Sequence, residues 1–224
     1  MQTKQAHFSF IIMKWLGIFW FGILALFAAS CNSTDKSADS SLSKDTIINQ
    51  KPTDTIADEE TLTTIATEIL TTLKAKDYKA FSAYFHPTDG VLFSPYGFID
   101  TKSSKKLTKA AFIKLIDEES IVNWGGYDGS GEPIKLTAQQ YLQKFVYNAD
   151  YLHAEKTAYN QIIGKGNSLN NLNDIYPKYP FIEYYFSGFD EKYAGMDWTS
   201  LRLVFRQYQS NYYLVAIIHD QWTS

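Results

Sequence analysis

The aromatic residues of this chain are segregated, and their distribution constrains where a core can form. Phe, Trp and Tyr make up 16% of the 224 residues, yet none lies between Cys31 and Asp77. All 29 aromatic residues that follow Phe27 lie within residues 78–224. Large rings supply much of the apolar area that a core buries, and 45% hydrophobic with 20% charged residues is a globular composition. We therefore expect one main globular domain, preceded by segments that have no core of their own.

The N-terminal part contains one uniformly apolar run, WLGIFWFGILALF (residues 15–27). A helix of this length reaches about 20 Å, which is short of a hydrocarbon core of roughly 30 Å. Lys14 precedes the run and the small residues 28–30 follow it. This order predicts a secretory signal peptide over residues 1–30. The alternative is an uncleaved membrane anchor over residues 8–29, which would place Lys14 inside the span at a cost in free energy.

The single cysteine, Cys31, stands directly after these small residues. The sequence Ala28-Ala29-Ser30-Cys31 resembles the lipobox of bacterial lipoproteins, with Ala28 at the position that is usually leucine. The resemblance implies that signal peptidase II cleaves before Cys31 and that the Cys31 thiol carries a diacylglycerol. Asn32, as a residue other than aspartate, implies sorting to the outer membrane of a Gram-negative cell. We therefore predict a lipoprotein of the cell envelope, attached to the membrane through the lipid on Cys31 and facing the periplasm or the cell surface.

The segment after the cysteine is polar. Residues 32–57 contain 9 Ser or Thr residues and no aromatic residue, and they show no sustained apolar period. Such a composition cannot bury enough apolar area to fold. We predict a disordered tether over residues 31–57 and an α+β globular domain over residues 58–224.

Helices are predicted at the start of this domain and between its strands. Six apolar residues from Leu62 to Leu73 form one amphipathic stripe, with Asp58 as the expected N-cap. A second helix is expected to end at His86-Pro87. Thr108 and Thr137 are expected to cap two more helices.

Strands dominate the rest of the domain. The predicted strands are VLF (91–93), YGFI (96–99), KTAYNQIIG (156–164), FIEYYF (181–186), SLRLVFRQY (200–208) and YYLVAIIH (212–219). Residues 209–211 are expected to join the last two strands as a hairpin. The final strand is apolar on both faces, so it should lie centrally in the sheet. The order of elements predicts N-terminal helices packed on an antiparallel sheet.

Two resemblances follow from these elements. The long first helix, the second helix "KDY…F…YFHP" and the closing "LRLVF…YYLVAIIHDQW" resemble the NTF2-like fold, which implies a curved antiparallel sheet wrapped around helices as a cone with a pocket. WGGYDGSGEPIKLT, FVYNADY and LVAIIHDQWT resemble a group of uncharacterised secreted or lipid-anchored bacterial proteins. The second resemblance implies no activity.

The most unusual local feature is the glycine-rich segment WGGYDGSGEP (124–133). It lacks the spacing of a P-loop and of a dinucleotide-binding motif. Glycines allow a backbone to approach a ligand closely, so Trp124, Tyr127, Asp128 and Glu132 are candidate binding residues for a small molecule or a cation. The alternative is a tight turn pinned by Trp124.

His219 is the fifth candidate binding residue. It ends the most apolar strand, beside Asp220, which would place it at a sheet edge or a pocket mouth. A histidine beside a carboxylate can act as a base, but a hydrogen-bonded structural histidine is the simpler interpretation. No catalytic residue is predicted, because the serines show no G-x-S-x-G motif and the one thiol is the expected lipid attachment.

Other ligand classes receive little support. The histidines lack the spacing of a metal site, and one cysteine excludes a disulfide framework within the chain. No metal or cofactor is predicted. A net charge of −3, with no basic run longer than two residues, argues against nucleic acid.

Tyrosines also gather in YPKYP (176–180) and EYY (183–185). They are either a platform for sugars and apolar ligands or part of the core. Three functions therefore compete. The first is a non-catalytic small-molecule-binding or accessory domain. The second is a small-pocket isomerase or hydrolase, and the third is a module that binds another envelope protein.

Overall fold

The computed structural model describes residues 54–167 and 169–223, with side chains from Asp58 onward. The chain divides into two units, Met1–Ile48 and Asn49–Ser224, and all described residues belong to the second. The predicted signal peptide, Cys31 and the tether as far as residue 53 lie outside the described residues. The first helix, α1, begins at Asp54, so the prediction that Asp58 caps it was wrong.

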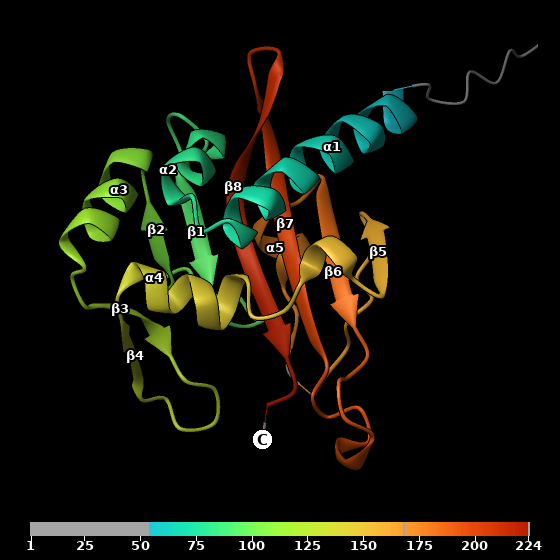
Figure 1. Ribbon diagram of the computed structural model, residues 1–224. Coiled ribbons are helices and arrows are strands. Elements are labelled where there is room, and N and C mark those ends of the chain that lie inside the picture. Colours follow the sequence, from blue (N-terminus) through green and yellow to red (C-terminus); the bar gives the residue numbers. More distant parts are fainter. Residues whose placement is uncertain (1–53, 168, 224) are drawn as a thin grey trace, which may run out of the picture. The chain divides into compact units, whose positions relative to one another are not determined.

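The domain is built on one mixed six-stranded sheet (Figure 1). The strand order is β2-β1-β8-β7-β6-β5. The strands are β1 (Val91–Ser94), β2 (Lys105–Leu107), β5 (Lys156–Tyr159), β6 (Phe181–Phe186), β7 (Thr199–Tyr208) and β8 (Asn211–Gln221). β1 pairs with β8 in parallel and the other pairs are antiparallel. The prediction of a purely antiparallel sheet was therefore wrong, while the α+β class and the central place of β8 are confirmed.

Helices occur before and between the strands. They are α1 (Asp54–Lys74), α2 (Tyr78–Phe81), α3 (Lys109–Glu118), α4 (Ala138–Tyr141) and α5 (Leu172–Ile175). Single turns of other helix types lie at Ser82–Tyr84, Leu142–Val146, Tyr151–His153 and Glu191–Tyr193. Thr108 and Thr137 cap α3 and α4 as predicted, each accepting a backbone hydrogen bond in the first turn. The helices are thus not confined to the part of the chain that precedes the strands.

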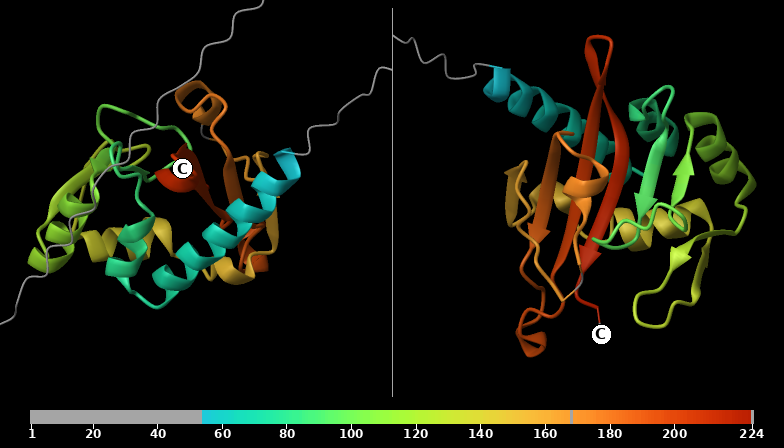
Figure 2. Two further views of the ribbon diagram at one scale, coloured as in Figure 1. Left: turned by 90° about the horizontal axis from the view of Figure 1, so that it is seen from above. Right: turned by 180° about the vertical axis from the view of Figure 1, so that it is seen from behind.

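The two faces of the sheet bury different partners, as Figure 2 shows. On β7, Leu201, Leu203 and Phe205 join the core beneath α1–α4. Val204 points the other way, into a smaller core with Leu172 of α5. This alternation is the period of two that a strand imposes on its side chains. The sheet is therefore covered on both faces, by α1–α4 on one and by the segment that carries α5 on the other.

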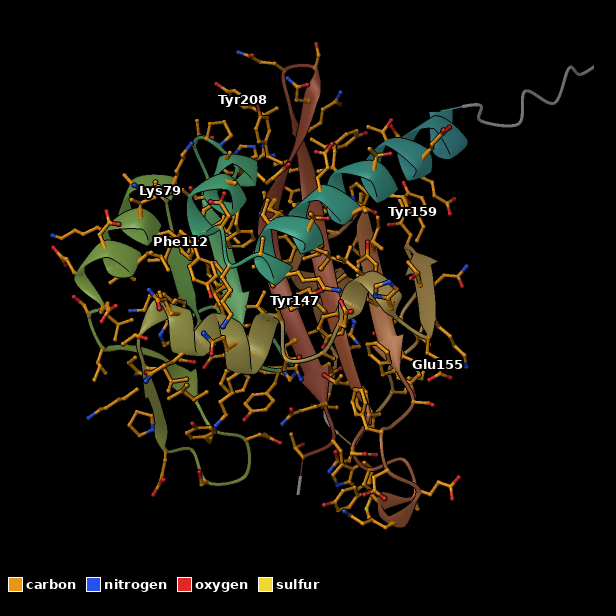
Figure 3. All side chains as sticks on the ribbon, in the orientation of Figure 1. Lys79, Phe112, Tyr147, Glu155, Tyr159 and Tyr208 are labelled. Atoms are coloured by element: carbon orange, nitrogen blue, oxygen red, sulfur yellow. The ribbon has the colours of Figure 1, made fainter. Side chains whose placement is uncertain are left out.

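Aromatic rings fill the space between the sheet and the helices. Trp124 stacks on Tyr141 with ring centroids 4.1 Å apart. Phe93 of β1 meets Trp124 edge-on at 5.6 Å and stacks on Phe112 of α3 at 6.1 Å. Phe112 is labelled in Figure 3, among the rings of this core. Because all four rings are buried, they form part of the core of the domain.

Three local predictions need correction. The strand predicted over residues 156–164 is shorter, since β5 ends at Tyr159. Residues 96–99 form a turn instead of a strand. The Ser94 hydroxyl donates a hydrogen bond to the Tyr96 carbonyl at 2.8 Å, and the Gly97 backbone lies so close to the Asp220 carboxylate that a side chain there would clash. The glycine-rich segment forms a two-stranded hairpin, β3 (Val122–Gly126) and β4 (Pro133–Leu136), where no strand was predicted.

Candidate functional site

Trp124 holds the glycine-rich hairpin, which consists of β3, β4 and residues 127–132 between them. Its indole ring is fully buried, and its Nε1–H donates to the Leu136 carbonyl at 3.0 Å. The Tyr127 N–H donates to the Glu132 carbonyl at 2.7 Å and closes the turn. Gly131 has a φ of 69°, a conformation that favours glycine. Trp124 thus has the position expected of the residue that pins the turn.

The hairpin forms one wall of an open cleft of about 430 Å³, named here the hairpin cleft. The opposite wall is the turn that follows β1. The lining residues are Pro95, Tyr96, Phe98, Asp100, Ser103, Ser104, Asn123, Gly125, Gly126, Tyr127, Asp128, Gly131 and Pro133. The structure therefore brings two predicted residues, Tyr127 and Asp128, into one cleft. Glu132 is exposed and does not line it.

Aromatic and acidic groups characterise this cleft. The rings of Tyr96 and Tyr127 both lie against Phe145, with centroids 6.0 and 6.4 Å away. Burial raises the pKa of the Tyr96 hydroxyl. Asp100 is bound to the Ser103 hydroxyl at 2.6 Å. The Asp128 carboxylate makes no hydrogen bond or ion pair with any described side chain, so it is available to a ligand.

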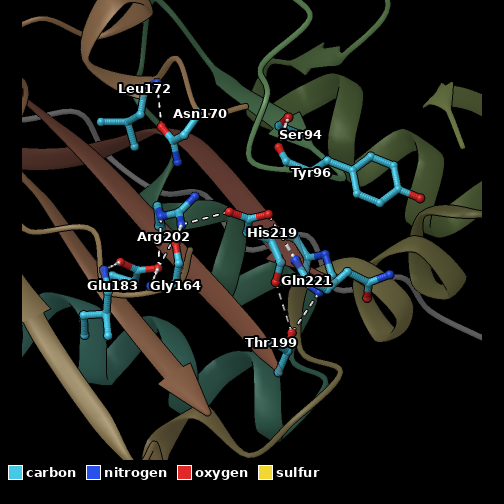
Figure 4. Close-up of polar contacts among 12 residues, drawn as sticks. Ser94, Tyr96, Gly164, Asn170, Leu172, Glu183, Thr199, Arg202, His219 and Gln221 are labelled. Atoms are coloured by element: carbon cyan, nitrogen blue, oxygen red, sulfur yellow. Dashed lines mark hydrogen bonds and ion pairs between the residues drawn. The ribbon is translucent and has the colours of Figure 1, made fainter. Parts of the chain in front are cut away.

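His219 lies on the helix side of the sheet and outside the hairpin cleft (Figure 4). Its Nδ1 is 3.0 Å from the Pro95 carbonyl, which can only accept, so Nδ1 carries the proton. Its Nε2 therefore accepts from the Thr199 hydroxyl at 3.0 Å. Full burial lowers the pKa of His219 to about 4. Both ring nitrogens are hydrogen-bonded, as in a structural histidine, and their one link to the hairpin cleft is Pro95.

Thr199 extends this network toward the helices. Its hydroxyl lies 3.0 Å from the Tyr151 hydroxyl and 3.2 Å from the Asn148 amide nitrogen. Tyr151 also donates to the Asn148 amide oxygen at 2.8 Å. The group fixes the start of β7 to the Tyr151–His153 turn.

A second buried network was missed by sequence reasoning. Arg202, on the opposite face of β7, is fully buried between Glu183 of β6 and Asp220 of β8 (Figure 4). The Arg202 Nε donates to Glu183 at 3.1 Å, and Nη2 donates to Asp220 at 3.0 Å. Burial raises the pKa of the Asp220 carboxyl, and the Arg202 guanidinium opposes that rise. The available signal was the charged residues of these three strands, whose shared face becomes evident only once the register is known.

The Arg202 network also binds the segment that covers this face. Glu183 accepts from the backbone N–H groups of Ile163 at 2.5 Å and Gly164 at 3.2 Å. Arg202 donates to the Gly164 carbonyl at 3.1 Å. Gly164 packs against the Trp198 ring, where a Cβ would clash. One carboxylate and one guanidinium thus anchor an irregular segment onto the sheet.

The described part of the chain holds no group of three or more His, Cys, Asp or Glu residues that is arranged to bind a metal. Within the same residues no helix is both long and apolar enough to span a membrane. No protein-family model, curated protein or solved structure matches the chain. The interpretation of the site therefore rests on the geometry above.

The burial of His219 predicts a pH-dependent stability. Its pKa of about 4 lies below the ordinary 6.5, so between these values the unfolded state binds more protons. Stability should fall by about 3 kcal/mol as the pH drops from 7 to 4. Urea unfolding should show this slope in the wild type and in His153→Gln, where an exposed histidine is replaced, and a smaller slope in His219→Gln. An equal slope in all three proteins would contradict the assignment.

Proposed function

We propose that this protein is a lipid-anchored protein of the cell envelope whose α+β domain binds a small molecule without transforming it. The observation that carries the proposal is the hairpin cleft, in which the predicted residues Tyr127 and Asp128 face the turn after β1. A concave site with apolar walls and a few polar groups is the usual form of a small-molecule site. The roles of Trp124, Glu132 and His219 as direct ligand contacts stay predictions, and their positions favour structural roles for Trp124 and His219.

The lining favours a ligand with an aromatic or apolar face and a positive group. Tyr96, Phe98 and Tyr127 offer ring surfaces, and Asp100 and Asp128 offer negative charge. The ammonium of Lys144, which is outside the lining, donates to the Tyr127 hydroxyl at 3.0 Å and lies 4.8 Å from the centre of its ring. Rings also attract cations directly. An amine attached to a ring would satisfy both features of the wall.

Within the α+β class, we propose the NTF2-like cone as the specific fold. Its support is that α1–α4 pack against one face of the sheet and that the chain closes with the β7–β8 hairpin. Buried rings fill the interior of this arrangement. In an NTF2-like interpretation the ligand would therefore bind at the rim of the cone and not in its centre.

The structure supports the two alternative functions to different degrees. An enzyme of isomerase or hydrolase type would require a desolvated acid or histidine that faces a tyrosine in a pocket. His219 reaches Tyr151 only through Thr199, and the hairpin cleft contains neither side chain. A protein-binding module is favoured by three exposed apolar residues of the β6–β7 loop, which are Phe189, Tyr193 and Met196.

The hairpin cleft can be tested with two matched probes, phenethylamine and phenylacetate, which share a ring and differ in the sign of their charge. Phenethylamine should shift the amide NMR resonances of residues 123–131, and phenylacetate should shift them less, because Asp100 and Asp128 repel a carboxylate. Asp128→Asn should weaken the response. Asp117→Asn, an exposed acid of α3, is the control. Binding of neither probe, or equal binding of both, would contradict the proposed ligand class.

The anchor is tested separately. Cys31→Ala should abolish metabolic labelling by an alkyne fatty acid and release the protein from membranes, because the thiol is the proposed acyl acceptor. Thermal unfolding of the domain should be unchanged. A Cys31→Ala protein that still fractionates with membranes would contradict the lipoprotein assignment and favour the uncleaved anchor.

A further inference from the structure

A second cleft, of about 550 Å³, lies at another part of the domain and is named here the tyrosine cleft. Four parts of the chain form it: α1, the end of β5, the stretch from α5 to the first residue of β6, and the β7–β8 hairpin. The lining residues are Asp58, Tyr159, Asn160, Asn173, Lys178, Tyr179, Pro180, Phe181, Phe205, Arg206, Gln207 and Tyr212. Tyr159 is labelled in Figure 3 at the end of β5. The two clefts share no lining residue.

The walls of the tyrosine cleft are fixed by backbone hydrogen bonds. The Asn160 N–H donates to the Phe181 carbonyl, and the Asn160 side-chain oxygen accepts from the Phe181 N–H, both at 2.9 Å. The Phe205 N–H donates to the Pro180 carbonyl at 2.8 Å. Asn160 and Lys178 have φ values of 53° and 67°. Asparagine adopts this left-handed backbone readily, because its short polar side chain can hydrogen-bond locally.

Rings and hydrogen-bonding groups alternate around this cleft. Tyr159, Tyr179 and Tyr212 supply three phenol rings. The Tyr212 hydroxyl donates to the Asp58 carboxylate at 2.8 Å. The amides of Asn173 and Gln207 complete the polar part of the wall. Flat rings beside planar polar groups suit a ligand that has apolar C–H faces and many hydroxyl groups.

The wall of the tyrosine cleft carries charges of both signs. Lys178 and Arg206 line the cleft together with one acid, Asp58. Arg206 lies 5.8 Å from the centre of the Tyr179 ring and forms an ion pair with Asp89, which is outside the lining. Lys178 is exposed and pairs with no carboxylate among the residues that the structure describes. Its ammonium is thus the group most available to a ligand carboxylate.

We propose that the tyrosine cleft binds an acidic saccharide. The sugar C–H faces would pack on the tyrosine rings, its hydroxyls would meet Asp58, Asn173 and Gln207, and its carboxylate would meet Lys178. This assigns a role to the YPKYP segment, for which the sequence leaves both a platform and a core role open. It is independent of the hairpin cleft, because a ligand in one cleft touches no residue of the other.

The test uses trigalacturonate and its fully methyl-esterified form, which present the same sugar with and without charge. Isothermal titration of the purified full-length protein should show trigalacturonate binding. Lys178→Gln should weaken it about fivefold, and Tyr179→Ala should weaken it about tenfold. The methyl ester should bind less tightly than the acid and should be insensitive to Lys178→Gln.

Two controls separate a site from a general effect. Lys165→Gln removes another exposed lysine of the same segment, and Tyr193→Ala removes an exposed tyrosine of the β6–β7 loop. Both should bind trigalacturonate like the wild type, and thermal unfolding should confirm that all four variants are folded. No binding of either sugar would overturn the proposal. Equal losses from Lys165→Gln and Lys178→Gln, or an ester that binds as tightly as the acid, would also overturn it.

Discussion

The ion cluster of Arg202, Glu183 and Asp220 is the constraint on which the covered sheet depends. A buried arginine is tolerated only when opposite charges and hydrogen bonds surround it. Here the guanidinium joins three adjacent strands, and Glu183 adds two backbone bonds to the segment that carries α5. The Arg202 Nη1 has no hydrogen-bond partner within the described residues, which adds to the cost of burial. The cluster therefore acts chiefly by specifying where that segment lies.

The opposite face of the sheet is stabilised mainly by aromatic packing and not by an ion cluster. There stacked rings fill the space beneath α1–α4, and the polar network around His219 and Thr199 is internally hydrogen-bonded. The Tyr141 hydroxyl is buried in the same core without a hydrogen-bond partner among the described residues. The two proposed ligand sites, the hairpin cleft and the tyrosine cleft, lie where irregular segments meet the ends of strands. Both proposals depend on loops that the two buried faces hold in place.

Features that depend on neighbouring residues could be predicted from the sequence. Contacts between distant segments could not. Thr108 and Thr137 correctly predicted the starts of α3 and α4, and residues 181–186 correctly predicted β6. Helix caps and strand periodicity depend on only a few neighbouring residues. The β3–β4 hairpin was missed, since W-G-G is typical of a loop and becomes a strand only when Trp124 stacks on Tyr141. The parallel pairing of β1 with β8, the Arg202 cluster and the tyrosine cleft all require the register of strands that are distant in the sequence.

The most direct measurement is the unfolding free energy of Arg202→Met beside that of Arg206→Met. Both substitutions remove an arginine from β7, but Arg206 is half-exposed and pairs with Asp89 at the surface. Loss of Arg202 removes the positive charge that faces two buried carboxylates and should cost about 3–5 kcal/mol. Loss of Arg206 should cost less than about 1 kcal/mol. Equal costs in urea unfolding would contradict the claim that the buried cluster specifies this fold.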